Sequence, residues 1–506
     1  MGHSLHKNSE PMLCVQQALC RINRHSLLRI DALELRQGEH WCVFGGNGAG
    51  KTLLSRLLLG QLPLGPGIVR YAADFDVQSQ VAVVSFEEQQ RLWTLDDRHD
   101  ISEYSDDAAD SGTTVRQLVL DSETPPASHA EFFAHLLQTL ELDALQLRGI
   151  RFLSSGQLRR AMIARALMGK RDGRFRLLVL DDPLESIDRQ SREAIVALLQ
   201  QWMDVDTCTL QLCRRAQDVL AGITHLAVMD GLQLKTQGPL AAVRHSAEFT
   251  EIVRREPALP EQLPSNCRSA ETTDRNVPLI ELRRVNAGYG NKQVLRELSW
   301  TMGPDNHSLI EGPNGCGKST LLSLIDGENH KAYGQEVYLC GRRRGSGETV
   351  WDVKALFGVV SNELHNKYIR GWKVLDVVVS GFFSTVGLYD DGGDALAACA
   401  RDWLRTLGIE AQAGHFYHEI SYGQQRLVLL ARAMVKSPRL LVLDEPCVGL
   451  DDYHRRTILG VVDRIAADTG TRILFVSHTS GEEPACINQR LRFEPQADGL
   501  YAVKIE

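Results

Sequence analysis

The chain has 506 residues, of which 43% are hydrophobic and 24% are charged, a composition typical of a globular protein with more than one domain. Its 56 lysines and arginines stand against 64 aspartates and glutamates, which gives a net charge of −8. This acidic balance excludes a protein that coats nucleic acid through its overall field, although a local basic patch remains open.

The N-terminal residues 1–10 carry no apolar periodicity and predict a flexible segment without a secretory signal. Apolar runs elsewhere are shorter than the roughly 20 residues that a membrane helix requires. We therefore expect a cytoplasmic protein, either free or peripheral on the inner face of the cell membrane.

The first clear element is the apolar run His40-Trp-Cys-Val-Phe44, which predicts a buried strand. It leads into Gly45-Gly-Asn-Gly-Ala-Gly-Lys-Thr52 and then into an amphipathic run, the strand, loop and helix order of a phosphate-binding loop (P-loop). The glycines allow backbone N–H groups to turn toward phosphate oxygens. We expect Lys51 to reach the β- and γ-phosphates of a nucleotide and Thr52 to bind Mg²⁺.

Three further features follow in the first half. Residues 96–112 hold seven acidic residues and predict a solvated surface loop. Leu153-Ser-Ser-Gly-Gln157 precedes a helical run rich in Arg, Ala and Leu. The apolar strand 177–180 then delivers Asp181 and Asp182 to the mouth of the P-loop, where Asp181 can hold Mg²⁺ through water.

The same series of motifs occurs a second time in the second half of the chain. Residues 255–278 contain four prolines and no apolar periodicity, which predicts a linker between domains at 11–254 and 279–506. Beyond it, strand 308–311 opens into Gly312-Pro-Asn-Gly-Cys-Gly-Lys-Ser319, and Lys318 lies 267 residues after Lys51. Such an offset, shared by successive motifs, indicates a duplicated domain.

The second copy continues with Ile420-Ser-Tyr-Gly-Gln424 and with strand 440–443, which ends in Asp444 and Glu445. Glu445 is placed to polarise an attacking water as general base, and Asp444 to hold Mg²⁺. In the first copy the residue at the general-base position is Asp182, whose side chain is one methylene shorter. Moving a catalytic carboxylate by about 1 Å already costs on the order of 10² in rate.

These motifs together resemble the ATP-binding cassette (ABC) ATPases, and the LSSGQ and ISYGQ stretches resemble the signature of that family. The resemblance implies an α/β fold with two tandem P-loop (RecA-like) nucleotide-binding domains, each with an antiparallel β-subdomain and a helical signature subdomain. It implies ATP hydrolysis to ADP and phosphate, with ATP and Mg²⁺ as ligands. In the family two such domains pair head to tail, so a monomer of this chain could be complete.

The resemblance also assigns roles to single residues. His478 matches the switch histidine, Leu450-Asp451 matches the D-loop, and Tyr289 matches the aromatic residue that stacks on adenine. The serine and glycine of each signature are expected to contact the γ-phosphate held by the other domain's P-loop. The candidate nucleotide-binding residues are Gly45, Gly46, Asn47, Gly48, Ala49, Gly50, Lys51, Thr52, Ser154, Ser155, Gly156, Gln157, Tyr289, Gly312, Pro313, Asn314, Gly315, Cys316, Gly317, Lys318, Ser319, Ser421, Tyr422, Gly423 and Gln424. The candidate Mg²⁺ ligands are Thr52, Asp181, Ser319 and Asp444.

The first copy departs from the family pattern. Arg214 stands at the switch position, Cys20 is interpreted as the counterpart of Tyr289, and the D-loop reads Ser186-Ile187-Asp188. Arg214 cannot accept a hydrogen bond, and Asp182 is a short base. The catalytic candidates are therefore Glu445 and His478 in a hydrolytic site, with Asp182 and Arg214 in a site that mainly binds ATP.

Both copies lack the family's glutamine at the end of a V-x-Q strand. Phe86 and Asn362 stand there instead, with Gln89 and Asn362 as candidates for partial replacement, which puts ordinary coupling to a permease in doubt. Arg342, Arg343 and Arg344 are weighed evenly between a solvated turn and a phosphate or partner contact. His415 and His418 have no further ligands nearby, so no transition-metal site is expected.

Two functions remain open from the sequence. The segment 339–353 and the paired layout resemble the family's molybdenum-transport ATP-binding proteins, also labelled photorepair proteins, which implies the energising subunit of an importer with a membrane permease as partner. The alternative is a soluble ABC ATPase that regulates or remodels nucleic acid or ribosomes. The N-terminus has no cysteine cluster, which argues against the ribosome-recycling branch of such ATPases. Nucleic acid is not the expected partner.

Overall fold

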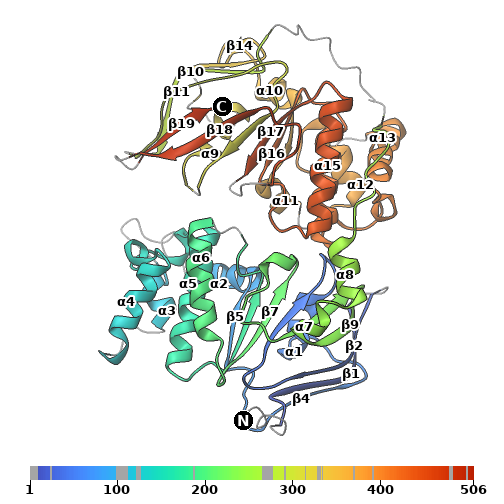
Figure 1. Ribbon diagram of the computed structural model, residues 1–506. Coiled ribbons are helices and arrows are strands. Elements are labelled where there is room, and N and C mark those ends of the chain that lie inside the picture. Colours follow the sequence, from blue (N-terminus) through green and yellow to red (C-terminus); the bar gives the residue numbers. More distant parts are fainter. Residues whose placement is uncertain are drawn as a thin grey trace. The chain divides into compact units, whose positions relative to one another are not determined.

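The computed structural model describes residues 10–22, 26–98, 112–120, 127–185, 189–264, 277–289, 292–313, 315–326, 332, 334–368, 371–389, 392–477, 482–496 and 500–506. The chain divides into two compact units, Met1–Arg255 and Glu256–Glu506, drawn blue to green and yellow to red in Figure 1. We call them the first and second units and describe each by itself.

The centre of the first unit is a parallel sheet of short apolar strands. Burial on both faces requires nearly continuous apolar runs, and β3 and β7 are buried at every position. The strands are β3 His40–Phe44, β5 Val81–Val84, β6 Leu177–Asp181, β7 Cys208–Cys213 and β8 His225–Asp230, in the order β8-β3-β7-β6-β5. Antiparallel β9 (Gln233–Pro239) pairs with β8.

An antiparallel layer extends this sheet. Strand β2 (Leu27–Leu35) buries mainly alternate residues, so only one of its faces meets the core. It pairs with β1 (Leu13–Arg21), which pairs in turn with β4 (Ile68–Tyr71). A single bridge between Arg29 and Gln233 joins β2 to β9 and gives one nine-stranded sheet.

The second unit repeats this strand order. Its six-stranded sheet runs β15-β16-β17-β12-β18-β19, which corresponds to β5-β6-β7-β3-β8-β9 of the first unit. These strands are β12 Ser308–Glu311, β15 Phe357–Val360, β16 Leu440–Asp444, β17 Arg472–Ser477, β18 Gln489–Pro495 and β19 Tyr501–Ile505. A separate antiparallel sheet holds β11 Lys292–Met302, β10 Ile280–Tyr289, β13 Glu336–Leu339 and β14 Arg342–Arg343. The predicted fold class of two P-loop α/β domains with antiparallel subdomains is confirmed.

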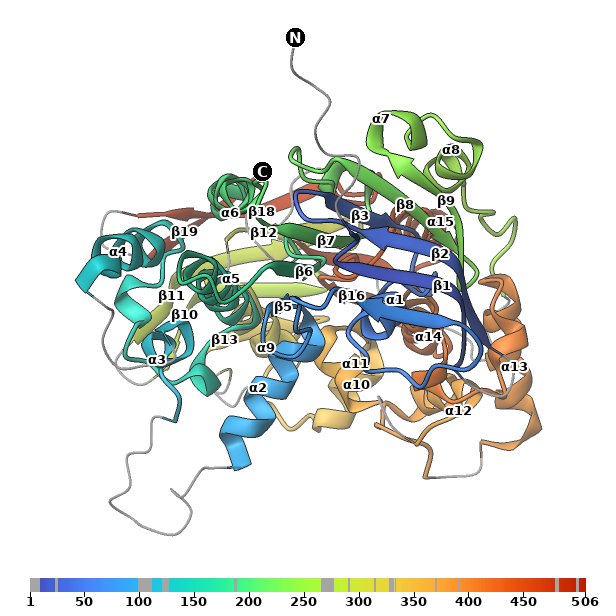
Figure 2. The same ribbon diagram turned by 90° about the horizontal axis from the view of Figure 1, so that it is seen from below.

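Helices of the first unit cover the sheet and build a helical subdomain in which α3 and α4 pack on α5 (Figure 2). The helices are α1 Lys51–Leu58, α2 Phe86–Arg98, α3 Val115–Leu120, α4 Ala130–Thr139, α5 Ser155–Arg171, α6 Arg189–Trp202, α7 Leu240–Val243 and α8 Ala247–Arg254. Long α5 also packs on β5, so it connects this subdomain to the sheet.

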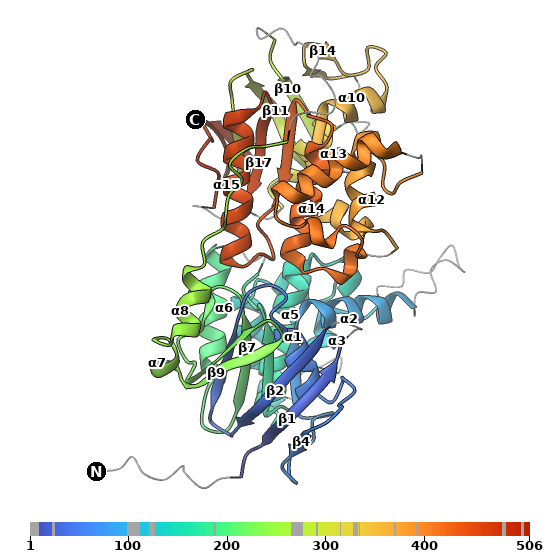
Figure 3. The same ribbon diagram turned by 90° about the vertical axis from the view of Figure 1, so that its right-hand side faces the viewer.

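In the second unit α12, α13 and α14 pack on one another, as Figure 3 shows. Helix α13 buries Ala400, Trp403 and Leu404, whose spacing places them on one face. The helices are α9 Lys318–Asp326, α10 Val350–Leu356, α11 Asn362–Lys367, α12 Val374–Val379, α13 Gly393–Thr406, α14 Tyr422–Met434 and α15 Asp452–Asp468. Among the helices that the structure describes, none is both long and apolar enough to cross a membrane.

The start of the predicted linker belongs to the second unit. Leu263 packs against the core around α14, and Leu259 lies so close to Gly460 of α15 that a Cβ atom there would meet it at 2.6 Å. Apolar side chains at these positions therefore hold residues 259–263 to the second unit. Residues 265–276 lie outside the described part, and a linker there stays a prediction.

Candidate functional site

Each P-loop lies between a buried strand and a helix that begins at its lysine. Gly48 and Gly50 have φ of 78° and 99°, and Gly315 and Gly317 have φ of 78° and 115°, in the region where a side chain is strained. The lysines fold back over their loops: Lys51 Nζ donates to the carbonyls of Gly45 and Gly46 at 2.8 and 2.9 Å. Lys318 Nζ donates to those of Gly312 and Pro313 at 2.7 and 3.0 Å. Both loops thus have the strand, loop and helix arrangement of a P-loop, and their contacts with a nucleotide stay a prediction; Asn314 lies outside the described residues.

The predicted Mg²⁺ ligands of the first unit converge. Thr52 Oγ1 donates to Asp181 Oδ2 at 2.9 Å. Burial and the neighbouring charge of Asp182 raise the pKa of Asp181. In the second unit Ser319 and Asp444 line one cavity. A hydroxyl and a carboxylate are the hard oxygen donors that Mg²⁺ prefers, so both sets fit this ion.

The Mg²⁺ contribution to nucleotide binding should depend on pH. Burial and the charge of Glu445 raise the pKa of Asp444 from 3.8 to about 6. Because its pKa is higher in the folded chain than in the unfolded chain, ionised Asp444 destabilises the fold as pH rises toward 6, and a bound cation offsets this cost. Below pH 6 a proton competes with the cation.

We therefore expect the gain in ADP affinity on adding Mg²⁺ to shrink about tenfold for each pH unit below about 6. Calorimetric titrations with and without Mg²⁺, between about pH 5 and about pH 7.5, measure this gain. An equal gain at both ends of the range would exclude Asp444 as a ligand, and Asp444→Asn is the matched variant.

The candidate general bases share an unusual backbone. Asp182 and Glu445 directly follow β6 and β16 and have φ of 45° and 48°. Their N–H groups donate to Leu212 O at 3.2 Å and to Val476 O at 3.1 Å, on the neighbouring strands β7 and β17. Left-handed backbone is costly for residues other than glycine and persists where the surrounding structure requires it, commonly at functional sites.

Arg214 forms an ion pair with Asp182, the candidate general base of the first unit. It follows β7, and its Nη2 lies 2.9 Å from Asp182 Oδ2 and 2.8 Å from Glu185 Oε2. Its side chain is only 13% exposed. Burial alone would lower the pKa of Arg214, but Asp182, Glu185 and Asp181 raise it above its ordinary value. Asp182 is therefore held as one partner in an ion-pair cluster.

The second unit differs at the corresponding positions. Glu185 lies three residues after Asp182, and Val448 lies three residues after Glu445. The counterpart of Arg214 is His478, which lies outside the described residues, as do residues 186–188 of the first D-loop. The ion pair of Glu185 with Arg214 was not predicted from the sequence. An acidic residue three positions after Asp182, in the copy that has an arginine at the switch-histidine position, could have indicated it.

Both signature motifs begin helices. Ser154 Oγ accepts from Gln157 N at 3.3 Å and Gln157 Oε1 accepts from Ser154 N at 2.9 Å, a capping box that starts α5. Ser421 and Gln424 form the same pair at the start of α14. Gly423 must be glycine because a Cβ there would lie 2.3 Å from the His454 ring. In the second D-loop, buried Asp451 caps α15 by accepting from His454 N at 2.7 Å.

The adenine position predicted for the first unit is wrong. Cys20 pairs with Leu28 as Ala287 pairs with Leu295, and Gln17 and Arg284 interrupt the two strands with the same left-handed backbone. Cys20 is only 1% exposed, and burial raises the pKa of its thiol. At this register Ile22 is the counterpart of Tyr289, whose side chain lies outside the described part. The first unit still has no aromatic ring there.

The residues at the glutamine position are committed to other contacts. Phe86 starts α2 with 48% of its surface exposed. Gln89 is buried and its Nε2 donates to Ser155 O at 2.6 Å, inside the signature, so its proposed role as partial replacement is not supported by its placement. Asn362 Oδ1 accepts from Arg426 and from Tyr422 OH.

The three consecutive arginines have different environments. Arg342 and Arg343 are exposed on the edge strand β14, but Arg344 is buried, with its Nη1 2.7 Å from Glu348 Oε1. Arg344 therefore has a structural role, so neither the solvated turn nor the phosphate or partner contact weighed for the three arginines applies to it. His418 stacks on Phe416, and the described residues contain no cluster of His, Cys, Asp or Glu able to hold a metal ion.

Comparison with known proteins identifies the family. The family model described as ABC transporter matches residues 28–185 and 295–448, one match in each unit. The chain belongs to the ABC transporter family. Each unit is therefore an ABC-type ATPase domain that binds ATP, and the prediction of a tandem ABC ATPase is confirmed.

Among ABC relatives, the ABC transporter ATP-binding protein ModF of Escherichia coli (strain K12) is 34% identical over 493 residues, 97% of this chain and 98% of that protein. The uncharacterized ABC transporter ATP-binding protein C323.04 of Schizosaccharomyces pombe is 26% identical over 490 residues, 93% of this chain and 95% of that protein. The solved structure of archaeal ribosome recycling factor aABCE1 with ribosomal stalk protein aP1 has a TM-score of 0.58 at 15% identity, covering 96% of this chain and 89% of that chain. At this identity the likeness shows the fold alone.

Proposed function

We propose that the second ABC unit hydrolyses ATP and that the first unit mainly holds it. The observation that carries this proposal is the cluster of Arg214 with Asp182 and Glu185. Asp182 Oδ2 lies 2.9 Å from Arg214 Nη2, so the oxygen that would position an attacking water is already engaged in an ion pair. Arg214 itself stays protonated, so it cannot replace the base.

The second unit has a longer base and no glutamate at the Val448 position. Glu445 would accept the proton of the attacking water, while Lys318 pairs with the phosphates. Ser319 and Asp444 would hold Mg²⁺, which neutralises phosphate charge when bound. By the family pattern, Ser154 and Gly156 would complete the γ-phosphate contacts of this site, and Ser421 and Gly423 those of the other.

As the wider function we propose the energising subunit of an ABC transport system, with a membrane permease as partner and molybdate as the solute implied by resemblance. The identity to ModF over nearly the full length of both chains supports this proposal. Gln89 and Asn362 are already hydrogen-bonded to Ser155 and Arg426, so coupling to a permease would use side chains other than the family's glutamine.

Affinity capture with the Glu445→Gln variant in the presence of ATP tests the wider function, because this variant should accumulate the ATP-bound state. We expect an integral membrane protein to be recovered with it, and less of it with Lys318→Ala/Glu445→Gln, which cannot hold the nucleotide at that site. Recovery of ribosomes or nucleic acid in its place would contradict transport and support the remodelling alternative.

A further inference from the structure

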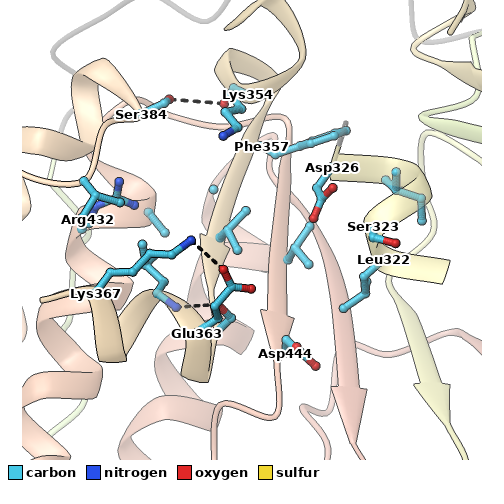
Figure 4. Close-up of a pocket in the computed structure, with 18 of the residues that line it drawn as sticks. Leu322, Ser323, Asp326, Lys354, Phe357, Glu363, Lys367, Ser384, Arg432 and Asp444 are labelled. Carbon is cyan, nitrogen blue, oxygen red and sulfur yellow. Dashed lines mark hydrogen bonds and ion pairs between the residues drawn. The ribbon is translucent and has the colours of Figure 1, made fainter. Parts of the chain in front are cut away.

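A cavity of about 250 Å³ lies within the second unit, among α9, β15, α11 and the end of α14 (Figure 4). Its apolar lining includes Leu322, Ile325, Phe357, Val359, Leu364 and Val386. The polar lining comes from lysines, an arginine, serine hydroxyls and the carboxylates of Asp326, Glu363 and Asp444, and Ser319 and Asp444 reach the cavity from the nucleotide side. An apolar cavity with a few converging polar groups is the usual form of a small-molecule site.

Two cations of this cavity, Arg432 and Lys436, have only neutral partners. Arg432 is 7% exposed, and it donates to Tyr368 OH at 2.9 Å, to Ser380 Oγ at 3.3 Å and to Thr385 O at 2.8 Å. Lys436 Nζ donates to Lys354 O and to Ser384 Oγ, both at 2.7 Å. Among the described residues, neither cation forms an ion pair with a carboxylate.

Charge near these two cations is unbalanced. A buried charge without a counter-ion is unfavourable, because desolvation is not repaid by an opposite charge. Burial, Arg432 and Lys354 lower the pKa of Lys436 to about 7. Asp326, Glu363 and Asp444 also line the cavity, but Glu363 Oε1 lies 2.6 Å from Lys367 Nζ, and Figure 4 shows Asp326 and Asp444 on the side away from Arg432.

The lysine is specific to the second unit. By the 267-residue offset, Arg432 corresponds to Arg165 and Lys436 corresponds to Gly169 in the first unit. A side chain at Gly169 would meet the Phe175 ring at 2.2 Å, so the first unit has no room for a lysine there. The paired cations are therefore a feature that one copy has and the other excludes.

We propose that this cavity binds a small organic anion, a carboxylate or phosphate ester with a short apolar body, whose anionic group pairs with Lys436 and Arg432. The apolar body lies along Leu322, Phe357 and Leu364. Ser319 and Asp444 line the same cavity, so the occupied cavity would share a wall with the nucleotide site. This proposal is independent of which unit hydrolyses ATP.

Calorimetric titration with hexanoate, and with neutral hexanamide of nearly the same shape, tests the proposal on the full chain with both P-loops filled with ADP. We expect wild type to bind hexanoate more tightly than hexanamide. Lys436→Met should weaken hexanoate binding about 30-fold, as for loss of one partner in a buried charge pair, and leave hexanamide binding unchanged.

Lys367→Met is the matched control, because Lys367 lines the same cavity but already pairs with Glu363; it should change hexanoate affinity less than about threefold. Lys436→Met removes a half-buried ammonium that forms no ion pair with a described carboxylate, so its melting temperature should not fall below that of wild type. Equal affinity of wild type for hexanoate and hexanamide, or wild-type affinity for hexanoate in Lys436→Met, would overturn the proposal.

Discussion

Replacing Glu445 with glutamine should lower steady-state ATP turnover by a factor of roughly 10²–10⁴, the usual contribution of a well-placed general base. The amide keeps the size of the side chain but cannot take the proton of the attacking water. Nucleotide binding should persist, because Lys318 and the P-loop glycines are unchanged. Phosphate release measured under saturating ATP checks the loss of turnover, and binding of a fluorescent ATP analogue checks the retained affinity.

The matched variant is Asp182→Asn in the first unit. Asp182 is already paired with Arg214 at 2.9 Å, and Arg214 keeps Glu185 as its second partner when the charge of Asp182 is removed. We therefore expect turnover to change less than about threefold. A loss as large as that of Glu445→Gln would show that both units hydrolyse, and unchanged turnover in Glu445→Gln would remove the second unit from that role.

Replacing Arg214 with alanine should destabilise the first unit by about 3 kcal/mol, because Asp182 loses its ion-pair partner and Glu185 keeps only Arg159, whose Nη1 lies 4.0 Å from Glu185 Oε2. The side chains of Arg214, Asp182 and Glu185 are at most 21% exposed, so water replaces the lost partner poorly. Differential scanning calorimetry of the full chain should show the transition of the first unit shifted down by about 2–4 °C per kcal/mol.

Two controls isolate this effect. Arg29→Ala breaks a pair whose side chains are 58% and 70% exposed, and it should cost less than about 1 kcal/mol. Arg214→Ala/Glu185→Ala removes one of the two carboxylates that lose Arg214 and should recover part of the loss. If the double variant were less stable than Arg214→Ala, the repulsion between the two carboxylates would not be the cause.

Much of the site could be predicted because its chemistry depends on local sequence. Each P-loop requires positive φ at two glycines, and few other residues tolerate that backbone, so the sequence alone identifies the loop. The signature helices likewise carry their own start signal, since Ser154 and Gln157 cap α5 without help from distant residues.

The error at Cys20 could have been avoided from the sequence, because the 267-residue offset between the copies already pairs Tyr289 with Ile22, and the strand register agrees. The other differences depend on tertiary contacts. Arg344 pairs with Glu348 inside the fold, which a run of three arginines does not reveal. The contact between Gln89 and Ser155 joins residues 66 positions apart and has no local signal.

The nucleotide content of the wild-type chain after turnover tests the inequality of the two ABC units most directly. The protein is incubated with Mg²⁺ and ATP, separated rapidly from free nucleotide and extracted with acid, and the bound ATP and ADP are counted per chain. We predict about one intact ATP per chain, retained by the first unit and lost in Lys51→Ala, with ADP or no nucleotide at the second site. Recovery of ADP alone, with no intact ATP, would contradict the account.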